Sequence, residues 1–264
     1  MGIFGNLDGG ASMKNLVYCS VFHQESYLKL LKLLIKSIKL FGDLNDTMDI
    51  LVITNKSFKN SVQKILDNNQ INGSIFCLPL NTLFEAGYSR LYIFDYPEIK
   101  KYKKVLYIDT DILVTNKLEL LFNIELDNKL YALKEGKTNN HKWGWDFFDD
   151  TGTQKNISAF TTGTLLFNNC EEIKMLFFKV FNHIKKHIKE EKPIPWCLEQ
   201  PFVVFHAITE NLYNSRELIG KVVSWPTEYN DEIIAHFPGF PGNYEFKIDG
   251  IENYFNYMLQ LKSK

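Results

Sequence analysis

The feature that most constrains the fold of this 264-residue chain is a regular alternation of apolar, strand-like runs with amphipathic helices. In the first helix, apolar residues recur at helical spacing and lysines follow one position later, which predicts one buried and one solvated face before the stop at Gly42. The apolar residues are Leu28, Leu31, Ile35 and Ile38, and the lysines are Lys29, Lys32, Lys36 and Lys39. Strands are predicted at residues 15–22, 49–54, 74–80 and 104–109, with helices at 57–69 and around 88–94. This alternation predicts an α/β fold with a parallel sheet covered on both faces.

The second half of the chain continues with shorter elements and no internal repeat or long linker. Short helices are expected at 118–122 and 198–208, longer ones at 171–189 and 250–261, and strands at 130–134, 163–167, 222–225 and 233–237. Residues 136–160 are expected to form a long polar and aromatic loop. We therefore predict a single domain over residues 13–264, with residues 1–12 as a non-native leader, because they are glycine-rich and lack periodicity.

Charge and cysteine usage exclude several classes of partner and location. The chain has 30 basic and 31 acidic residues and a formal charge of −1, so no basic surface predicts binding to nucleic acid or to an anionic membrane. No segment approaches the roughly 18 apolar residues of a membrane span, and residues 1–12 lack the basic segment followed by an apolar one that is typical of a signal peptide. The isolated cysteines Cys19, Cys77, Cys170 and Cys197 fit a reducing compartment, so we expect an intracellular, cytoplasmic protein.

Two aspartates stand where a buried strand leaves the predicted sheet. Asp109, Thr110 and Asp111 directly follow the apolar run 105–108, and ligands of open parallel sheets bind outside the carboxyl ends of the strands. Two carboxylates one residue apart can hold a hard divalent cation, which in turn binds phosphate oxygens. The alternative is that these short acidic residues only cap a strand-to-loop turn.

The surrounding segment carries a family resemblance. Residues 88–122, YSRLYIFDYPEIKKYKKVLYIDTDILVTNKLELLF, resemble the central block of the glycogenin-like retaining glycosyltransferases, family 8 of the GT-A fold. The resemblance implies one GT-A domain with a Rossmann-like, mostly parallel central sheet flanked by helices. It also implies that Arg90 contacts the donor and that Asp109 and Asp111 hold a metal ion against the diphosphate of a sugar nucleotide, with Thr110 beside them.

Two later segments resemble family blocks that surround the donor sugar. In FTTGTLLFN, residues 160–168, Thr161 and Thr162 stand where the family has an Asn or Ser before a Gly. Glu199 and Gln200 resemble an acidic residue followed by Gln near the anomeric carbon, with Glu in place of the usual Asp. The resemblance leaves open which of these two lies nearer to the reacting carbon.

The C-terminal segment AHFPGFPGN, residues 235–243, resembles the block that completes the metal and diphosphate site. His236 then supplies the third metal ligand and Gly239 approaches the diphosphate. The family's lysine six positions after this His is Gly242 here, and we expect Lys247 to replace it. One imidazole beside two carboxylates favours manganese, with magnesium as the alternative.

Two further regions complete the predicted site. Ser20 and Tyr27 fall near the family's contacts to the nucleotide base. The loop HKWGWDFFDD, residues 141–150, combines aromatic rings with carboxylates and is either an acceptor-sugar site or a loop pinned to the core. His183 and His187, four residues apart, lack the Glu of an H-E-x-x-H zinc motif, so we expect them on a lysine-rich solvated helix face.

The resemblance implies a metal-dependent retaining glycosyltransferase that moves a hexose, glucose or galactose, from a UDP-sugar to a hydroxyl acceptor, and this is the function that we predict. The acceptor stays open between glycan, protein and lipid, and a homodimer is one alternative for the oligomeric state. Two other functions stay open. One is a haloacid-dehalogenase-like sugar phosphatase with Asp109 as nucleophile, and the other is a non-catalytic sugar-nucleotide binding protein.

Overall fold

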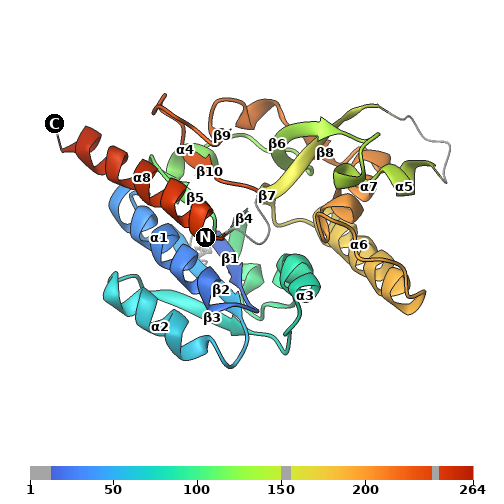
Figure 1. Cartoon of the computed structure of the whole chain (residues 1–264), viewed down its shortest axis with the longest axis horizontal. Coiled ribbons are helices and arrows are strands. Elements are labelled where there is room, and N and C mark those ends of the chain that lie inside the picture. Colours follow the sequence, from blue (N-terminus) through green and yellow to red (C-terminus); the bar gives the residue numbers. More distant parts are fainter. Residues whose placement is uncertain (1–12, 150–155, 240–243, 264) are drawn as a thin grey trace, which may run out of the picture.

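A seven-stranded mixed sheet forms the centre of the computed structural model, which describes residues 13–149, 156–239 and 244–263 (Figure 1). Its strands are β1 (Lys14–Val21), β2 (Met48–Thr54), β3 (Gly73–Cys77), β4 (Tyr102–Ile108), β6 (Leu130–Lys137), β7 (Ser158–Asn168) and β8 (Tyr213–Asn214). Their order is β3-β2-β1-β4-β7-β6-β8, and only β7 runs antiparallel to its neighbours. The expected mostly parallel α/β sheet is therefore confirmed.

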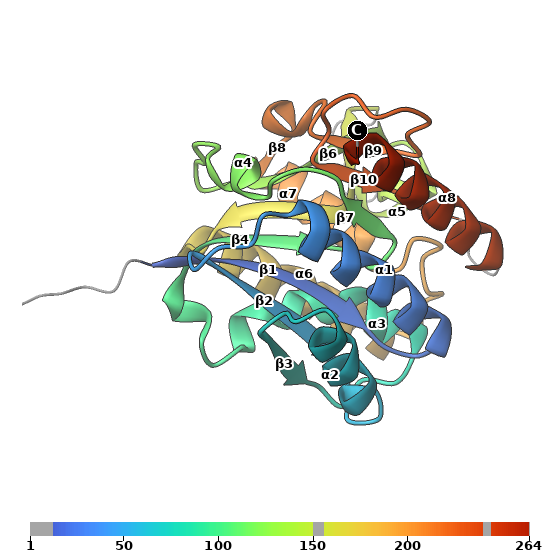
Figure 2. The same ribbon diagram turned by 90° about the vertical axis from the view of Figure 1, so that its left-hand side faces the viewer.

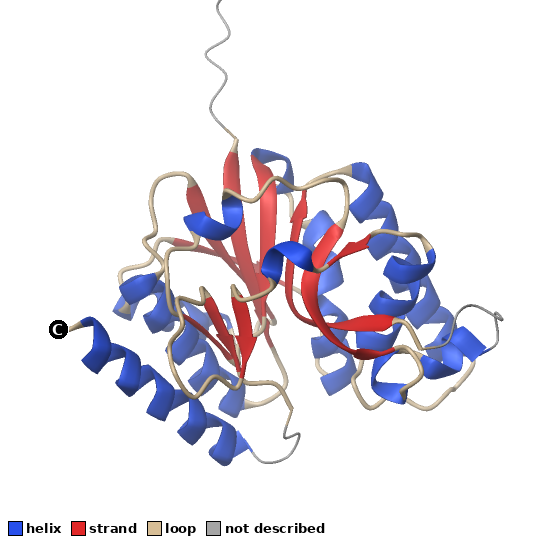
Figure 3. Cartoon of the chain, turned by 90° about the horizontal axis from the view of Figure 1, so that it is seen from above, coloured by secondary structure: helices blue, strands red, loops and turns tan. Residues whose placement is uncertain are grey.

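Helices cover both faces of this sheet (Figure 3). The α-helices of the described residues are α1 (Glu25–Phe41), α2 (Lys59–Asn68), α3 (Leu83–Tyr88), α4 (Glu119–Phe122), α5 (Trp145–Asp149), α6 (Glu171–Lys189), α7 (Gln200–Thr209) and α8 (Tyr244–Lys262). Four 3₁₀ helices join them: η1 (Ser89–Asp95), η2 (Ile99–Lys101), η3 (His141–Trp143) and η4 (Arg216–Leu218).

The two-residue period of β1 divides the core into two layers. Val17 and Cys19 pack with α1 and α2 on one face, whereas Leu16 and Tyr18 pack with η1, α6 and α7 on the other. Figure 2 shows α1 and α2 on the first of these faces. The predicted apolar stripe of α1 is buried in this layer, and its lysine stripe is exposed.

A second, three-stranded sheet lies at the end of β4. It consists of β5 (Ile112–Val114), β9 (Val222–Ser224) and β10 (Ile234–His236), in the order β5-β10-β9. The pairing of β5 with β10 is antiparallel and sets His236 opposite Ile112, while the Phe237 amide donates to the Asp111 carbonyl at 3.0 Å. Helix α8 packs on this sheet and on α1, through Ile251, Phe255 and Met258. This small sheet therefore joins the Asp109–Asp111 turn to a strand more than 120 residues later.

Several element boundaries differ from the sequence predictions. The helix expected around 88–94 is α3 followed by η1, and a capping box between Thr82 and Glu85 starts it earlier. The expected loop at 136–160 contains η3 and α5, and α8 begins at Tyr244 instead of near residue 250. The leader predicted at residues 1–12 lies outside the described residues. The four cysteines are free, and among the described helices none is both long and apolar enough to cross a membrane.

Candidate active site

One cavity of about 540 Å³ lies at the carboxyl ends of β1 and β4 and is closed on other sides by β7, β10, α7 and α8. It brings together every residue that the sequence predicted for the site. These are Ser20, Tyr27, Arg90, Asp109, Thr110, Asp111, Thr161, Thr162, Glu199, Gln200, His236, Gly239 and Lys247. Segments from residue 20 to residue 247 therefore meet in one place, which is the position expected for a ligand of an open α/β sheet.

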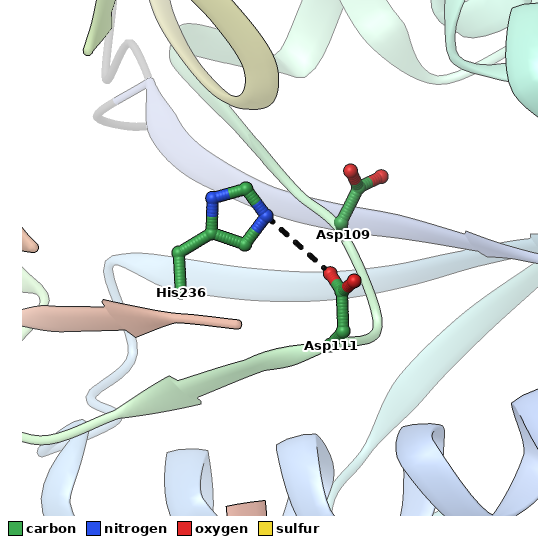
Figure 4. A group of neighbouring side chains, drawn as sticks. All are labelled: Asp109, Asp111 and His236. Carbon is green, nitrogen blue, oxygen red and sulfur yellow. Dashed lines mark ion pairs between the residues drawn. The ribbon is translucent and has the colours of Figure 1, made fainter. Parts of the chain in front are cut away.

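Asp109, Asp111 and His236 form a compact set of potential metal ligands (Figure 4). One ligand atom from each residue lies within 4.8 Å of the others. The Nε2 atom of His236 is 3.5 Å from Oδ1 of Asp111, and this buried oxygen has no hydrogen-bond partner among the described residues. Two carboxylates, one imidazole and an orphaned oxygen suit a divalent ion such as manganese. The residues present therefore fit the metal that the resemblance implies.

Gly163 of β7 makes room for this set of ligands. A Cβ atom at this position would lie 2.4 Å from Cε1 of His236 and 3.1 Å from Oδ2 of Asp109. The Asp109 amide also donates to the Gly163 carbonyl at 2.8 Å, so the antiparallel strand β7 fixes the backbone of the turn. The sequence contained Gly163 within the FTTGTLLFN block, but no local signal showed that it faces His236.

Arg90 is buried and joins several parts of the cavity. Its Nη2 lies 3.1 Å from Oδ1 of Asp109, its Nε lies 3.1 Å from Oε1 of Glu199, and its Nη1 donates to the Thr162 carbonyl at 2.6 Å. The guanidinium also stacks over the Tyr107 ring at 4.3 Å. Burial raises the pKa of Asp109 above its ordinary value, against the opposing charge of Arg90. Arg90 thus positions both carboxylates, and its predicted contact with the donor stays a prediction.

Glu199 and Gln200 are held by different partners at the start of α7. Glu199 accepts a hydrogen bond from the Thr162 hydroxyl at 2.9 Å, in addition to its ion pair with Arg90. The Gln200 amide accepts from the Thr162 backbone at 3.1 Å and donates to the Lys142 carbonyl at 3.0 Å. Burial raises the pKa of Glu199, although Arg90 opposes this shift. Both polar ends of Gln200 are therefore occupied by backbone groups, whereas Glu199 brings a charge to the cavity.

Lys247 reaches the metal-ligand set from the first turns of α8. Its Nζ lies 2.7 Å from Oδ2 of Asp111, and its side chain is 8% exposed. Burial alone would raise the pKa of Asp111, but the charges and hydrogen bonds of Lys247 and His236 together hold this pKa below its ordinary range. The sequence predicted Lys247 as a substitute for a phosphate-binding lysine, and the structure places it beside a carboxylate of the same site.

The remaining predicted residues also line this cavity. The hydroxyls of Tyr27 and Tyr244 are 2.5 Å apart, so α1 and α8 are joined at this edge. The Ser20 hydroxyl is buried and has no partner within the described part of the chain, and Gly239 has a φ of 85°, which favours glycine. Tyr244 was not predicted, because nothing in its local sequence distinguishes it from other tyrosines.

The aromatic loop at 141–150 serves two purposes. Trp143 lines the cavity, whereas Phe148 is buried and Phe147 packs against Phe202, so these two rings pin the loop to the core. The side chains of Trp145, Asp149 and Asp150 lie outside the described residues. Trp196, on the segment between α6 and α7, lines the cavity with 70% of its side chain exposed and was not predicted.

The prediction of a solvated face at His183 and His187 was wrong. His187 is buried, and its Nε2 atom lies 2.8 Å from the carbonyl oxygen of Pro193. The His183 ring packs against Phe147 and Phe202. The lysines of α6 are exposed, whereas the two histidines face α5 and α7. A helix period places both histidines on one face but does not show which neighbours cover it.

A larger cavity of about 730 Å³ lies at the opposite ends of β1 and β2. Its charged residues pair with one another, as in Lys14–Asp49 at 2.9 Å and Lys117–Asp43 at 2.8 Å. Size alone therefore does not make it the better candidate, because the unpaired polar atoms and the potential metal ligands line the smaller cavity.

Comparisons with known proteins bear on the family and the fold of the chain. The chain is 30% identical over 159 residues to the glycosyltransferase GlyB of Streptococcus pneumoniae serotype 4 (strain ATCC BAA-334 / TIGR4). The matched segment covers 56% of this chain and 35% of GlyB. The chain thus spans about a third of this curated relative. Two solved structures share the fold. The bifunctional glycosyltransferase WbbM has a TM-score of 0.63 at 17% identity, over 97% of this chain and 53% of WbbM. The galactosyltransferase LgtC, solved with donor and acceptor sugar analogues, has a TM-score of 0.56 at 16% identity, over 90% and 95%.

The family model for glycosyl transferase family 8 matches residues 23–220, which is most of the chain. This match contains Arg90, the Asp109–Asp111 turn and the Glu199–Gln200 pair, and it ends before His236. The GT-A-like arrangement of the sheet agrees with it. The chain therefore belongs to glycosyl transferase family 8, as the resemblance of its central block predicted.

Proposed function

We propose that this family 8 glycosyltransferase is a metal-dependent, retaining enzyme that transfers a hexose, glucose or galactose, from a UDP-sugar to a hydroxyl acceptor. The observation that carries the proposal is the meeting of Asp109, Asp111 and His236 in one cavity with Arg90 and Glu199. A bound manganese ion would neutralise the charge that grows on the departing diphosphate.

The chain's own residues supply the rest of the proposed mechanism. Arg90 holds the carboxylates of Asp109 and Glu199 in place, so that neither has to reorganise during the reaction. Glu199 places a buried negative charge in the cavity, where it stabilises positive charge at the anomeric carbon. Gln200, tied to Thr162 and Lys142, fixes β7 and the aromatic loop around the sugar.

The donor and the metal are tested together with purified protein and a panel of UDP-sugars. Released UDP and intact protein mass are measured with manganese and with a chelator. We expect chelator-sensitive UDP release from UDP-glucose or UDP-galactose, lost in Asp109→Asn because a carbonyl oxygen replaces a charged ligand. Full transfer activity of Asp109→Asn in manganese contradicts the metal assignment. Release of inorganic phosphate from sugar phosphates favours a phosphatase, and UDP binding without turnover favours a binding protein.

For the acceptor, we propose a saccharide that stacks on Trp196 at the cavity mouth, with Trp143 deeper in the same cavity. An exposed indole ring at the rim offers a flat apolar face to the C–H surface of a sugar. We expect Trp196→Ala to raise the acceptor KM about tenfold and to leave UDP-sugar hydrolysis unchanged. The matched control is Phe178→Ala, an exposed ring on α6 that does not line this cavity. An unchanged acceptor KM in Trp196→Ala contradicts the stacking site.

A further inference from the structure

We propose that Lys247 is a built-in competitor of the divalent metal, and that a bound nucleoside diphosphate relieves this competition by taking over the lysine ammonium. The inference rests on the metal site proposed above. It predicts that metal and diphosphate bind cooperatively and that the cooperativity depends on the charge of one side chain.

The Asp111 carboxylate can bind two cations, the Lys247 ammonium and the proposed metal ion. Asp111 turns Oδ1 toward His236 and the metal-ligand set, and it gives Oδ2 to the Lys247 ammonium at 2.7 Å. The side chains of Lys247 and Asp111 are 8% and 15% exposed, so water screens this pair weakly. A dication that binds Asp111 therefore meets a buried positive charge already bound to the same carboxylate.

The packing of α8 supports the position of the Lys247 ammonium. Lys247 lies near the start of α8, whose buried residues Ile251, Phe255 and Met258 anchor the helix on α1 and on the β5–β10 pair. The Tyr244 hydroxyl, also at the start of α8, is 2.5 Å from that of Tyr27. The ammonium is thus held near Asp111 by a helix that is fixed at several points.

The positive and negative charges that line the cavity nearly balance. The lysine, arginine and carboxylate residues that line the cavity are three cations and four anions: Arg90, Lys142, Lys247, Asp109, Asp111, Glu135 and Glu199. Their formal sum is −1, so a dication alone leaves the cavity positive. A diphosphate adds negative charge and offers oxygens that accept charge-assisted hydrogen bonds from Lys247. Metal and diphosphate then favour each other, by the same factor in both directions.

The experiment measures manganese binding directly, by electron paramagnetic resonance of free Mn²⁺ and by calorimetry, with and without UDP. In the unchanged protein we expect weak binding of manganese alone and at least tenfold tighter binding with saturating UDP. Lys247→Met removes the charge at similar length. It is expected to bind manganese alone at least tenfold more tightly than the unchanged protein, with a UDP effect below threefold.

Two matched variants separate charge from shape. Lys247→Arg keeps the charge and is expected to retain weak binding of manganese alone and strong tightening by UDP. Lys29→Met removes the same charge from the exposed face of α1 and is expected to change neither value. Circular dichroism and thermal melting establish that each variant is folded, and Lys247→Gln replaces Lys247→Met if the latter does not fold.

Three outcomes overturn the inference. If Lys247→Met and Lys247→Gln bind manganese alone no more tightly than the unchanged protein, while that protein binds manganese with UDP, Lys247 does not compete and the proposed function stands. If Lys247→Arg behaves like Lys247→Met, the effect is one of shape. If the unchanged protein binds no manganese with or without UDP, the proposed metal site and this inference both fail.

Discussion

Arg90 is the side chain on which the electrostatics of the cavity most depend. It is 6% exposed and lies beside Glu199, which is 2% exposed, so that removing the guanidinium leaves a carboxylate buried without its counter-charge. The chain has few arginines, and the family resemblance of residues 88–122 directed attention to Arg90. The sequence did not show that its partners include the Thr162 carbonyl and the Tyr107 ring.

We predict that Arg90→Met lowers the free energy of unfolding by roughly 3 kcal/mol, because breaking a buried ion pair leaves one charge uncompensated. Urea denaturation measures the change. Glu199→Gln in the same chain should recover part of the loss, since no buried charge then remains at this position. Additivity of the two single changes in the double variant would show that the two side chains are not coupled.

A second prediction at the residue scale concerns Gly163. Gly163→Ala sets a methyl group 2.4 Å from the His236 ring, so we expect manganese binding in the presence of UDP to fall at least tenfold. Calorimetry with manganese and UDP measures it. Gly73→Ala is the control, since its methyl group meets flexible Leu66 atoms at 3.1 Å, far from the cavity. Unchanged manganese affinity in Gly163→Ala would place the metal away from His236.

At the scale of elements, the junction of α5, α6 and α7 carries an unusual histidine pair. Nδ1 of His183 lies 3.2 Å from Nε2 of His206, and both rings pack among phenylalanines. Burial lowers the pKa of His183 to about 4, and the positive charges of His206, His187, Lys186 and Lys192 act in the same direction. The native state therefore contains neutral His183, whereas the unfolded chain binds a proton near the ordinary pKa of about 6.5.

This pair predicts a pH dependence of stability. Stabilisation by neutral His183 is complete above about pH 6.5 and is lost as the pH falls toward 4, because the unfolded state binds more protons in that window. We expect His183→Gln to show a flatter loss of unfolding free energy between pH 6.5 and 4.5 than the unchanged protein. Exposed His141, replaced by Gln, is the control. Equal slopes for both variants and the unchanged protein would contradict the prediction.

Some elements followed from the sequence, among them the short α4, β9 and β10, and others did not. Helix α6 and strand β2 carry enough periodic residues for the pattern to define them, and α6 was predicted at the bounds that it has. Strand β5 has only three residues and forms because β10 pairs with it, and α5 lies within a loop whose rings find partners on α7. Tertiary contacts create these elements, so local sequence carries little sign of them.

At the scale of the whole molecule, the sheet topology was predictable only in part. Alternating strands and helices predicted that β1, β2, β3 and β4 run parallel, because helical crossovers impose that direction, but their order was not predicted. The reversal at β7 was not predicted, since it depends on pairing with both β4 and β6. The family resemblance supplied the order of site residues, whereas the sequence alone did not show that Lys247 would contact Asp111.

A site assembled from so many segments predicts strong coupling between ligand binding and global stability. In the presence of manganese, UDP at about 100 times its dissociation constant adds about 2.7 kcal/mol, which raises the melting temperature by roughly 5–10 °C for a domain of this size. Thermal melting measures this shift, and Asp109→Asn is expected to show little of it. A similar shift in both proteins would indicate binding outside the proposed metal site.

The pairing of β5 with β10 has a consequence for how such a chain tolerates change in length. His236 faces the aspartates because its strand pairs in one register with residues 112–114, and a slip of one residue would turn the imidazole to the opposite side of the small sheet. The backbone hydrogen bonds between β5 and β10 therefore set the position of His236 whatever the length of the loops between the two strands. Insertions in the loops between residues 115 and 232 can accumulate without displacing the imidazole, whereas one deletion within β10 would move the imidazole away from the aspartates.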